Sequence, residues 1–208
     1  MALKINEIFG PAIQGEGSTA GCPAIFIRLS GCNMSCSFCD TSHQRAASAS
    51  VDEIIKAVRD LDEHDNCKLV VITGGEPLLQ TGHPLCDLMH SLVVNEYEVQ
   101  IETNGTLNSF DALSYSKHVM CSPKVTFDKL GINKEMVTCW KLLFPYQFDP
   151  KPYIKFAKQF MKEQSKVSFY LQPVDGVEDS LQKTIDEVKR LGAPWRLGVQ
   201  LHKIIGEK

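Results

Sequence analysis

Residues 24–41 read AIFIRLSGCNMSCSFCDT, and this stretch carries the strongest signal for the fold. Its first six residues, Ala24–Leu29, are almost all apolar, a pattern that predicts a buried β-strand. Three cysteines follow, Cys32, Cys36 and Cys39, in the spacing C-x3-C-x2-C. In α/β folds the chemically active side chains follow the strands directly, so this stretch predicts a site at the end of a strand.

Strand-like and helix-like segments alternate along the rest of the chain. Apolar runs typical of strands are Ala24–Leu29, Leu69–Thr73, Tyr97–Glu102, His118–Cys121, Trp140–Phe144, Val167–Leu171 and Arg196–Gln200. Helical patterns cover residues 50–61, Leu85–Val94, Tyr153–Gln164 and Asp179–Leu191. This alternation predicts a parallel sheet with helical crossovers. The chain is short for an eight-fold barrel, so we predict an α/β fold, a partial (open) βα barrel of about six parallel strands, in a single domain of residues 1–208.

The first helix has a clear start signal. Ser50 is followed three residues later by Glu53, which is the pattern of a capping box. Apolar side chains then recur at helical spacing at Ile54, Val58 and Leu61. The sequence therefore predicts a helix that begins at Ser50 and packs one face on the sheet.

Composition excludes several classes of protein. Of the 208 residues 43% are hydrophobic and 23% are charged, and the formal net charge is −3. There is no basic stripe, so we do not expect direct binding of nucleic acid. We also expect no membrane span, because no apolar run is long enough. The N-terminal MALKINEIFG lacks the layout of a signal peptide, which favours a cytoplasmic protein.

Eight cysteines in a reducing compartment favour metal binding or reactivity over disulfides. The three clustered thiolates could hold three irons of a 4Fe–4S cluster and leave the fourth iron open for another ligand. Zinc is the alternative, with Asp40 or His43 as fourth ligand, although no second CxxC pair is present. A non-catalytic metal-binding module therefore stays open. We expect the dispersed cysteines to be small buried residues; they are Cys22, Cys67, Cys86, Cys121 and Cys139.

Polar segments follow the later strands. Glu102–Gly105 (ETNG) contains a strong turn dipeptide and is either a plain turn or a polar loop that faces a ligand. Ser122–Lys124 (SPK) and Gln172–Asp175 (QPVD) offer donors and acceptors, but each signal is weak alone.

The cysteine triplet, with Phe38 before its last cysteine, resembles the radical S-adenosylmethionine (SAM) superfamily. Thr73–Pro77 (TGGEP) is similar to the GGEP motif of that superfamily. The resemblance implies a radical-SAM type barrel in which the three cysteines, the catalytic and metal-binding residues, ligate a 4Fe–4S cluster. It also implies that SAM chelates the open iron and is split to a 5′-deoxyadenosyl radical.

A narrower resemblance spans nearly the whole chain. Segments that are similar to the 7-carboxy-7-deazaguanine synthases, in the same order, are NEIF (6–9), IQGEG (13–17), PAIFIRLSG (23–31), CDT (39–41), SPK (122–124), LQP (171–173) and VQLHK (199–203). This family converts 6-carboxy-5,6,7,8-tetrahydropterin to 7-carboxy-7-deazaguanine with loss of ammonia, in 7-deazapurine (queuosine, preQ0) biosynthesis. The enzyme is a carbon–nitrogen lyase that regenerates SAM. The main alternative, an activating enzyme for glycyl-radical proteins, would lack the IQGEG segment.

The resemblance also implies partners and site residues. We expect a homodimer, reduction by a flavodoxin or ferredoxin, and a Mg²⁺ ion at Thr41. The implied substrate-binding residues are Ile13, Gln14, Gly15, Glu16, Arg28, Thr73, His202 and the terminal Lys208. The implied cofactor-binding residues are Gly74, Gly75, Glu76, Ser122, Pro123, Lys124, Gln172, Pro173, Val174 and Asp175.

Some of these residues have structural alternatives. Arg28 could make an ordinary salt bridge, Thr41 could cap a turn, and His202 could be a satisfied surface or core histidine. The end Gly206-Glu207-Lys208 also departs from the Gly-Ile-Pro-like tail of the family.

Overall fold

A nine-stranded sheet organises the computed structural model, which describes the chain except for residues 1, 40–45, 81, 163–165 and 208. The strands are β1 (Ala2–Ile13), β2 (Pro23–Leu29), β3 (Ala47–Ser50), β4 (Leu69–Gly74), β5 (Glu98–Thr103), β6 (His118–Cys121), β7 (Cys139–Phe144), β8 (Ser168–Pro173) and β9 (Trp195–Leu197). Their order in the sheet is β3-β1-β2-β4-β5-β6-β7-β8-β9.

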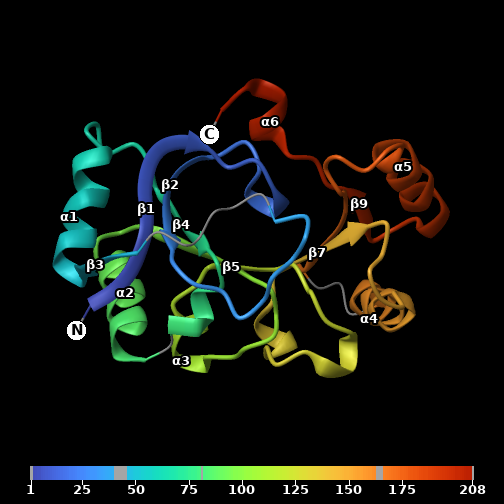
Figure 1. Cartoon of the computed structure of the whole chain (residues 1–208), viewed down its shortest axis with the longest axis horizontal. Coiled ribbons are helices and arrows are strands. Elements are labelled where there is room, and N and C mark those ends of the chain that lie inside the picture. The colour runs from blue at the N-terminus through green and yellow to red at the C-terminus, as the bar shows by residue number, and fades with distance from the viewer. Residues whose placement is uncertain (1, 40–45, 81, 163–165, 208) are drawn as a thin grey trace.

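The sheet is an open barrel. Strand β2 and strands β4 to β9 pair in parallel, whereas β1 lies antiparallel to both β2 and β3. The strands curve around a central space, and the helices lie on the outside (Figure 1). This arrangement confirms the predicted partial barrel, with seven parallel strands in the described part of the chain where about six were expected.

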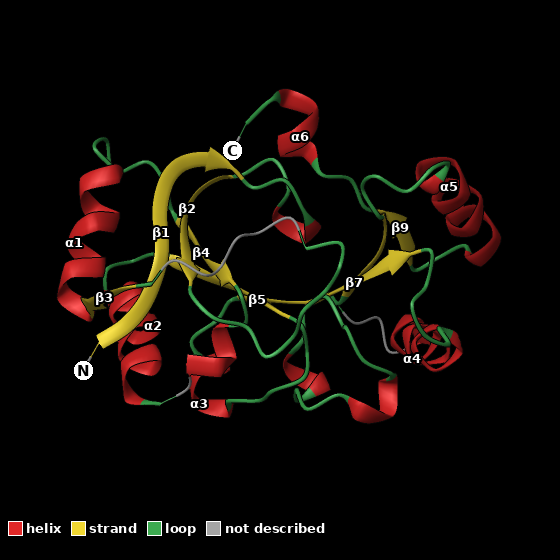
Figure 2. Cartoon of the chain, in the orientation of Figure 1, coloured by secondary structure: helices red, strands yellow, loops and turns green. Residues whose placement is uncertain are grey.

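Six α-helices connect and flank the strands in the described residues. They are α1 (Val51–Leu61), α2 (His83–Val94), α3 (Phe110–Ser114), α4 (Lys151–Lys162), α5 (Ser180–Leu191) and α6 (Leu201–Ile205). Short 3₁₀ turns span Gly17–Thr19, Pro77–Gln80, Phe127–Lys129 and Lys134–Met136. Helices α1 to α5 surround the sheet, and α6 lies near the C-terminal end of the curved β1 (Figure 2). None of these helices, among the residues described, has the length and apolar character to cross a membrane.

The capping box at α1 is confirmed. The Ser50 Oγ accepts from the Glu53 backbone N–H at 3.3 Å, and the Glu53 carboxylate accepts from the Ser50 N–H at 2.7 Å. Ile54 and Val58 are fully buried against the sheet, as the helical spacing predicts. The start of this helix is therefore set by local side-chain chemistry.

Strands β1 and β3 were not predicted. Strand β1 is half-exposed over most of its length, so it shows no continuous apolar run. Strand β3 reads ASAS, four small residues with weak strand preference, and it is held by pairing with β1 between Ala2 and Ile5. Both strands form through tertiary pairing that local sequence does not reveal.

The dispersed cysteines only partly match the expectation of burial. Cys67, Cys121 and Cys139 are buried, which confirms it. Cys22 is exposed and Cys86 is half-buried, so the expectation was wrong for these two. Cys22 lies directly before β2, outside the packed part of the strand.

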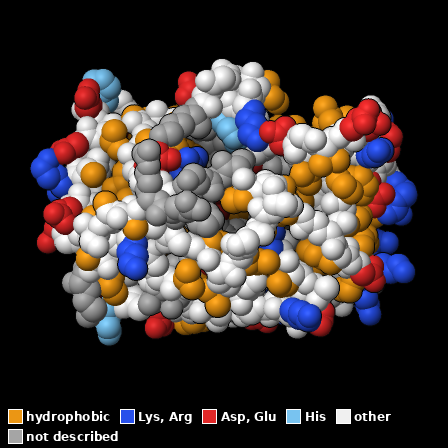
Figure 3. All heavy atoms as spheres, viewed as in Figure 1, with side chains coloured by type: hydrophobic (Ala, Val, Ile, Leu, Met, Phe, Trp, Pro, Cys, Tyr) orange, Lys and Arg blue, Asp and Glu red, His pale blue; other side chains and the backbone are white. Residues whose placement is uncertain are grey.

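The alternation of side chains along the strands positions the site. Outward side chains such as Ile25, Ile27 and Ile72 join the main core under the helices. Inward side chains at the start of the strands form a small apolar cluster that includes Phe26 and Val71. Towards the carboxyl ends the inward positions become polar. On the face of the molecule shown in Figure 3, charged side chains of both signs lie mostly towards its outer edge.

Candidate active site

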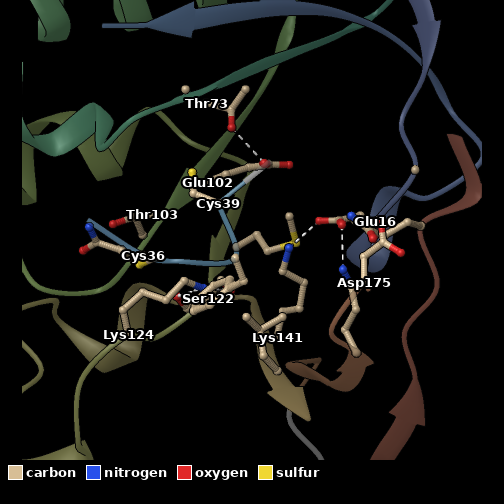
Figure 4. Close-up of a pocket in the computed structure, with 18 of the residues that line it drawn as sticks. Glu16, Cys36, Cys39, Thr73, Glu102, Thr103, Ser122, Lys124, Lys141 and Asp175 are labelled. Atoms are coloured by element: carbon tan, nitrogen blue, oxygen red, sulfur yellow. Dashed lines mark hydrogen bonds and ion pairs between the residues drawn. The ribbon is translucent and has the colours of Figure 1, made fainter. Parts of the chain in front are cut away.

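A cavity of about 510 Å³ lies at the carboxyl ends of the parallel strands. Its walls come from the β1–β2 loop, the cysteine loop, the ends of β4 to β8 and α6. Figure 4 shows ionisable side chains from several strands pointing into this space. The position is the one that parallel α/β folds use for ligands.

The cysteine loop forms one side of the cavity. Cys32, Cys36 and Cys39 all line it, and the Cys39 N–H donates to the Cys36 carbonyl at 3.1 Å. Burial raises the pKa of the Cys36 thiol, and the neighbouring Cys39 and Cys32 charges raise it further, against the lowering effect of Lys124. Burial therefore disfavours the thiolate form of Cys36, which a strongly cationic group such as an iron cluster would stabilise.

Among the residues that the structure describes, no three His, Cys, Asp or Glu side chains are grouped so as to hold one metal ion. No disulfide joins the described cysteines either. The donor set fits a cluster with three thiolate ligands and an open iron. Asp40 and His43, considered as zinc ligands, lie outside the described residues.

The loop after the first cysteine is tied to the ETNG segment. The Asn33 side chain donates to the Thr106 hydroxyl at 2.8 Å and accepts from the Asn104 side chain at 3.0 Å. Asn104 lines the cavity itself. Both interpretations of the ETNG segment are therefore present, since the segment turns the chain and also faces the cavity.

Gly74 and Gly75 let two backbones come together. A Cβ atom at Gly74 would collide with the backbone of Leu29, and one at Gly75 with the carbonyl oxygen of Gly31. The Gly75 N–H donates to the Leu29 carbonyl at 3.1 Å. The end of β4 thus packs directly on the segment that enters the cysteine loop, and both glycines also line the cavity.

Glu76 is fully buried beneath the cavity wall and does not line the cavity. Its carboxylate accepts from the Thr103 hydroxyl at 2.9 Å, the Asn104 N–H at 2.7 Å and the Leu78 N–H at 3.0 Å. Burial raises the pKa of Glu76, while these hydrogen bonds and Lys124 act in the opposite direction. The residue joins the ends of β4 and β5.

Glu102 collects three donors on the inner face of the sheet. Its carboxylate accepts from the Gln14 amide at 2.9 Å, the Thr73 hydroxyl at 2.9 Å and the Gln100 amide at 3.1 Å (Figure 4). The network links the IQGEG segment to β4 and β5. It fixes the carboxylate at the cavity wall.

Glu16 and Lys141 form a buried ion pair, and their side chains are only 11% and 12% exposed. The Gln172 amide also donates to Glu16 at 2.6 Å (Figure 4). Burial raises the pKa of Glu16, but the Lys141 charge and hydrogen bonds from Lys141, Gln172 and Gln200 outweigh it and bring the pKa to about 2. Burial lowers the pKa of Lys141, yet Glu16 and Glu102 raise it overall. Both members of the pair are charged at neutral pH.

The Gln172 side chain has an unused acceptor. Its amide N–H₂ faces Glu16, while its Oε1 is buried and has no hydrogen-bond partner within the described part of the chain. This oxygen has almost no accessible surface and lies against Gly198, so its missing hydrogen bond is a cost to the fold.

Lys124 lies beside the cysteine loop. Its ammonium donates to the Ser122 hydroxyl at 2.7 Å and lies 5.6 Å from the centre of the Phe38 ring. Burial and the charge of Lys141 lower the pKa of Lys124 to about 8. This cation faces the side of the cavity where the thiolates are.

Arg28 pairs with Glu7 at 2.6 Å and stacks over the Phe9 ring at 4.8 Å. It also lines the cavity. Arg28 therefore makes the salt bridge that was considered as its structural role, and it also lines the cavity.

Helix α6 closes the cavity against the IQGEG segment. The Leu201 N–H donates to the Gly15 carbonyl at 2.9 Å, and a Cβ at Gly15 would collide with the His202 ring. Lys203 forms an ion pair with Asp175 at 2.8 Å. Segments from both ends of the chain therefore meet at this wall.

The structure gathers most of the predicted site residues around one cavity. Glu76 and Pro123 are exceptions, because neither lines it. Thr41 and Lys208 lie outside the described residues. Lining residues that sequence reasoning assigned no role include Phe26, Met34, Met120, Lys141, Leu143, Gln200 and Lys203. Lys141 had a signal, since it is the one charged residue in the apolar run CWKLLF.

Comparison with known proteins agrees with the fold and the three-cysteine cavity. The Radical SAM superfamily pattern matches residues 26–137, so the chain is a radical SAM protein. That membership implies a 4Fe–4S cluster and SAM as cofactors.

Similar proteins of known name identify the family within the radical SAM proteins. The chain is 35% identical to the 7-carboxy-7-deazaguanine synthase of Methanospirillum hungatei, over 98% of this chain and 86% of that protein. It is 38% identical to the 7-carboxy-7-deazaguanine synthase of Bacteroides thetaiotaomicron, over 99% and 98%. The crystal structure of QueE from Escherichia coli matches with a TM-score of 0.73 and 26% identity, over 97% of this chain and 95% of that one. The chain belongs to the 7-carboxy-7-deazaguanine synthase family.

Proposed function

We propose that this enzyme converts 6-carboxy-5,6,7,8-tetrahydropterin to 7-carboxy-7-deazaguanine with loss of ammonia, as a step of queuosine-type 7-deazapurine biosynthesis. The observation that carries the proposal is one cavity with two chemically different sides. In Figure 4, Cys36, Cys39 and Lys124 lie towards one side and Glu16 towards the other, with Glu102 between them in the view. A radical source and a binding site for an N–H-rich ring are thereby brought together.

The cofactor side is formed by the cysteine loop and its neighbours. Cys32, Cys36 and Cys39 would hold a 4Fe–4S cluster, which together with SAM would supply a 5′-deoxyadenosyl radical for hydrogen abstraction. The backbone of Gly74–Gly75 is open to the cavity and offers polar contacts to SAM. Gln172–Asp175, at the end of β8, supplies further contacts from the opposite wall.

The substrate carboxylate belongs at Arg28. A guanidinium has five N–H donors in a planar fork, so pairing with Glu7 leaves donors for a second carboxylate. Stacking on Phe9 holds the guanidinium plane in place.

The ring N–H groups of the pterin belong at Glu16 and Glu102. Glu16 is ionised at neutral pH, so it accepts hydrogen bonds only. Gln14 and Thr73 hold Glu102 in a fixed orientation.

Three further assignments rest on the resemblance to the family. Thr41 would contribute to holding a Mg²⁺ ion, a hard cation that prefers oxygen ligands. A flavodoxin or ferredoxin delivers the reducing electron. The active protein is a homodimer of single-domain chains.

An anaerobic product assay tests the proposal. Reconstituted protein is incubated with reductant, SAM and 6-carboxytetrahydropterin, and 7-carboxy-7-deazaguanine is sought by mass. We expect product together with a cubane absorption spectrum. An intact cluster that releases 5′-deoxyadenosine without this product would refute the substrate, and stoichiometric zinc without a cluster would refute the radical chemistry.

A further inference from the structure

Lys141 is a buried cation on the inner face of the barrel. On β7, Trp140 and Leu142 point outward into the main core, so Lys141 and Leu143 point inward and line the cavity. The lysine therefore projects from the middle of a strand, where backbone pairing with β8 holds its position.

The ammonium of Lys141 has unused hydrogen-bonding capacity. It has three N–H donors, and among the described residues its hydrogen-bond partner is Glu16. Figure 4 shows this pair side by side at the cavity, with Lys141 reaching across from its strand. The cavity wall thus presents a donor directly beside an acceptor.

An ion pair that served structure alone would contribute little free energy to folding at this buried position. Desolvating two charges offsets much of their attraction, and apolar residues of similar size serve stability equally well. The inner face is apolar deeper in the barrel, at Leu69 and Val71, neither of which lines the cavity. The change from apolar to charged residues occurs where the cavity begins, which points to a ligand that uses both charges.

We propose that Lys141 and Glu16 together read the lactam edge of the pterin, with Lys141 donating to the ring 4-oxo group while Glu16 accepts from the adjacent N3–H. This inference rests on the proposed function and identifies a specificity determinant within it. A 4-oxo pterin presents acceptor and donor side by side, which matches the pair. A 4-amino pteridine presents the reverse order, a donor at position 4 and an acceptor at N3. Its amino group would then face the Lys141 ammonium, and its N3 would face the Glu16 carboxylate.

Binding of two stable ligands tests the assignment. The probes are pterin-6-carboxylate and 2,4-diaminopteridine-6-carboxylate, measured by anaerobic equilibrium dialysis against the cluster-loaded protein with SAM. We expect Lys141→Met to weaken binding of the 4-oxo ligand about 10- to 100-fold, as for loss of a charged hydrogen bond. Binding of the 4-amino ligand should be unchanged or stronger. Lys155→Met, on the exposed face of α4, is the matched control for loss of a lysine charge.

The pH dependence of binding gives a second readout. Groups that face Glu16 include Lys141 from β7, Lys124 near the cysteine loop, Glu102 from β5 and His202 from α6. Lys141 is the main group that keeps Glu16 ionised. In Lys141→Met, Glu16 should take up its proton at a higher pH. As the pH is lowered, binding of the 4-oxo ligand should therefore be lost earlier than in the parent protein.

An unchanged preference for the 4-oxo ligand in Lys141→Met would overturn the inference. This holds whether the binding of both ligands weakens equally, as in a general loss of structure, or does not change at all. If the single variant does not fold, Lys141→Met combined with Glu16→Gln removes both charges and must show the same loss of preference. Product formation by the parent protein separates the two proposals, because its absence would count against the proposed function alone.

Discussion

Single residues matter most where charge is buried. Lys141, Glu16 and Glu102 lie on the inner face of a sheet whose outer face is packed with apolar side chains. A buried ion is tolerated when a partner and hydrogen bonds replace the lost water. Sequence reasoning named Glu16 and the ETNG segment but gave Lys141 no role. It could not show that Glu16 and Lys141 meet, because they are 125 positions apart.

The ion pair should be strongly coupled. Lys141→Met alone leaves the Glu16 carboxylate buried without its cation, and we expect about 3–5 kcal/mol less stability. Lys141→Met with Glu16→Gln should cost clearly less than the sum of the two single changes. Urea unfolding of all four proteins measures the coupling. Additive effects, within about 0.5 kcal/mol, would show that the two residues do not interact.

Acid stability should depend on Glu16. Its pKa is about 2 in the folded protein against 4.5 for an ordinary glutamate, so the unfolded chain binds the proton more readily. The stabilisation is complete above about pH 4.5 and is lost as the pH falls towards 2. Unfolding free energies at pH 6, 4.5 and 3.5 should therefore fall more steeply for the parent protein than for Glu16→Gln. Parallel curves would contradict the low pKa.

At the scale of elements, the site depends on how strand ends meet. The runs of β2 and β4 were predictable because both strands are buried on two faces and read as apolar throughout. The direction in which the Glu76 side chain points could not be predicted from the sequence. The motif placed it next to two cavity glycines, but the turn after β4 sends its carboxylate under the wall towards Thr103.

Gly75→Ala should separate these strand ends. The added methyl group would collide with the Gly31 carbonyl, a rigid backbone atom at the entry to the cysteine loop. We expect iron content after reconstitution to fall several-fold, with lower thermal stability. Gly176→Ala is the control, because no atom lies near its added methyl and only its left-handed backbone is strained. Equal iron content in both variants would rule out the proposed role of this contact.

At the scale of the whole molecule, the core and the site are spatially separate. The main core lies between the sheet and the outer helices, and none of the described residues 32–39 of the cysteine loop belongs to it. The overall architecture could be predicted because alternating strands and helices dictate a parallel sheet. The antiparallel edge formed by β1 and β3 could not, because its pairing partners are distant in sequence.

The fold should therefore survive loss of the cluster. Cys36→Ala removes one of three ligands from a loop outside the core, and we expect no stable cluster with an unchanged far-ultraviolet circular dichroism spectrum. Iron analysis and the spectrum of the reconstituted variant measure both effects. Parent-level iron content would show that Cys36 is not a ligand, and a collapsed spectrum would show that the loop holds the fold.

The contact between Gly15 and Leu201 has a consequence for the order of biosynthesis. The cysteine loop and its supports, Gly75 and Asn104, all lie in the first half of the chain, so they leave the ribosome together. The wall built by Gly15 and α6 is finished only after α6 (Leu201–Ile205) has emerged. During synthesis, the metal-binding loop is therefore available long before the chamber that selects the substrate exists.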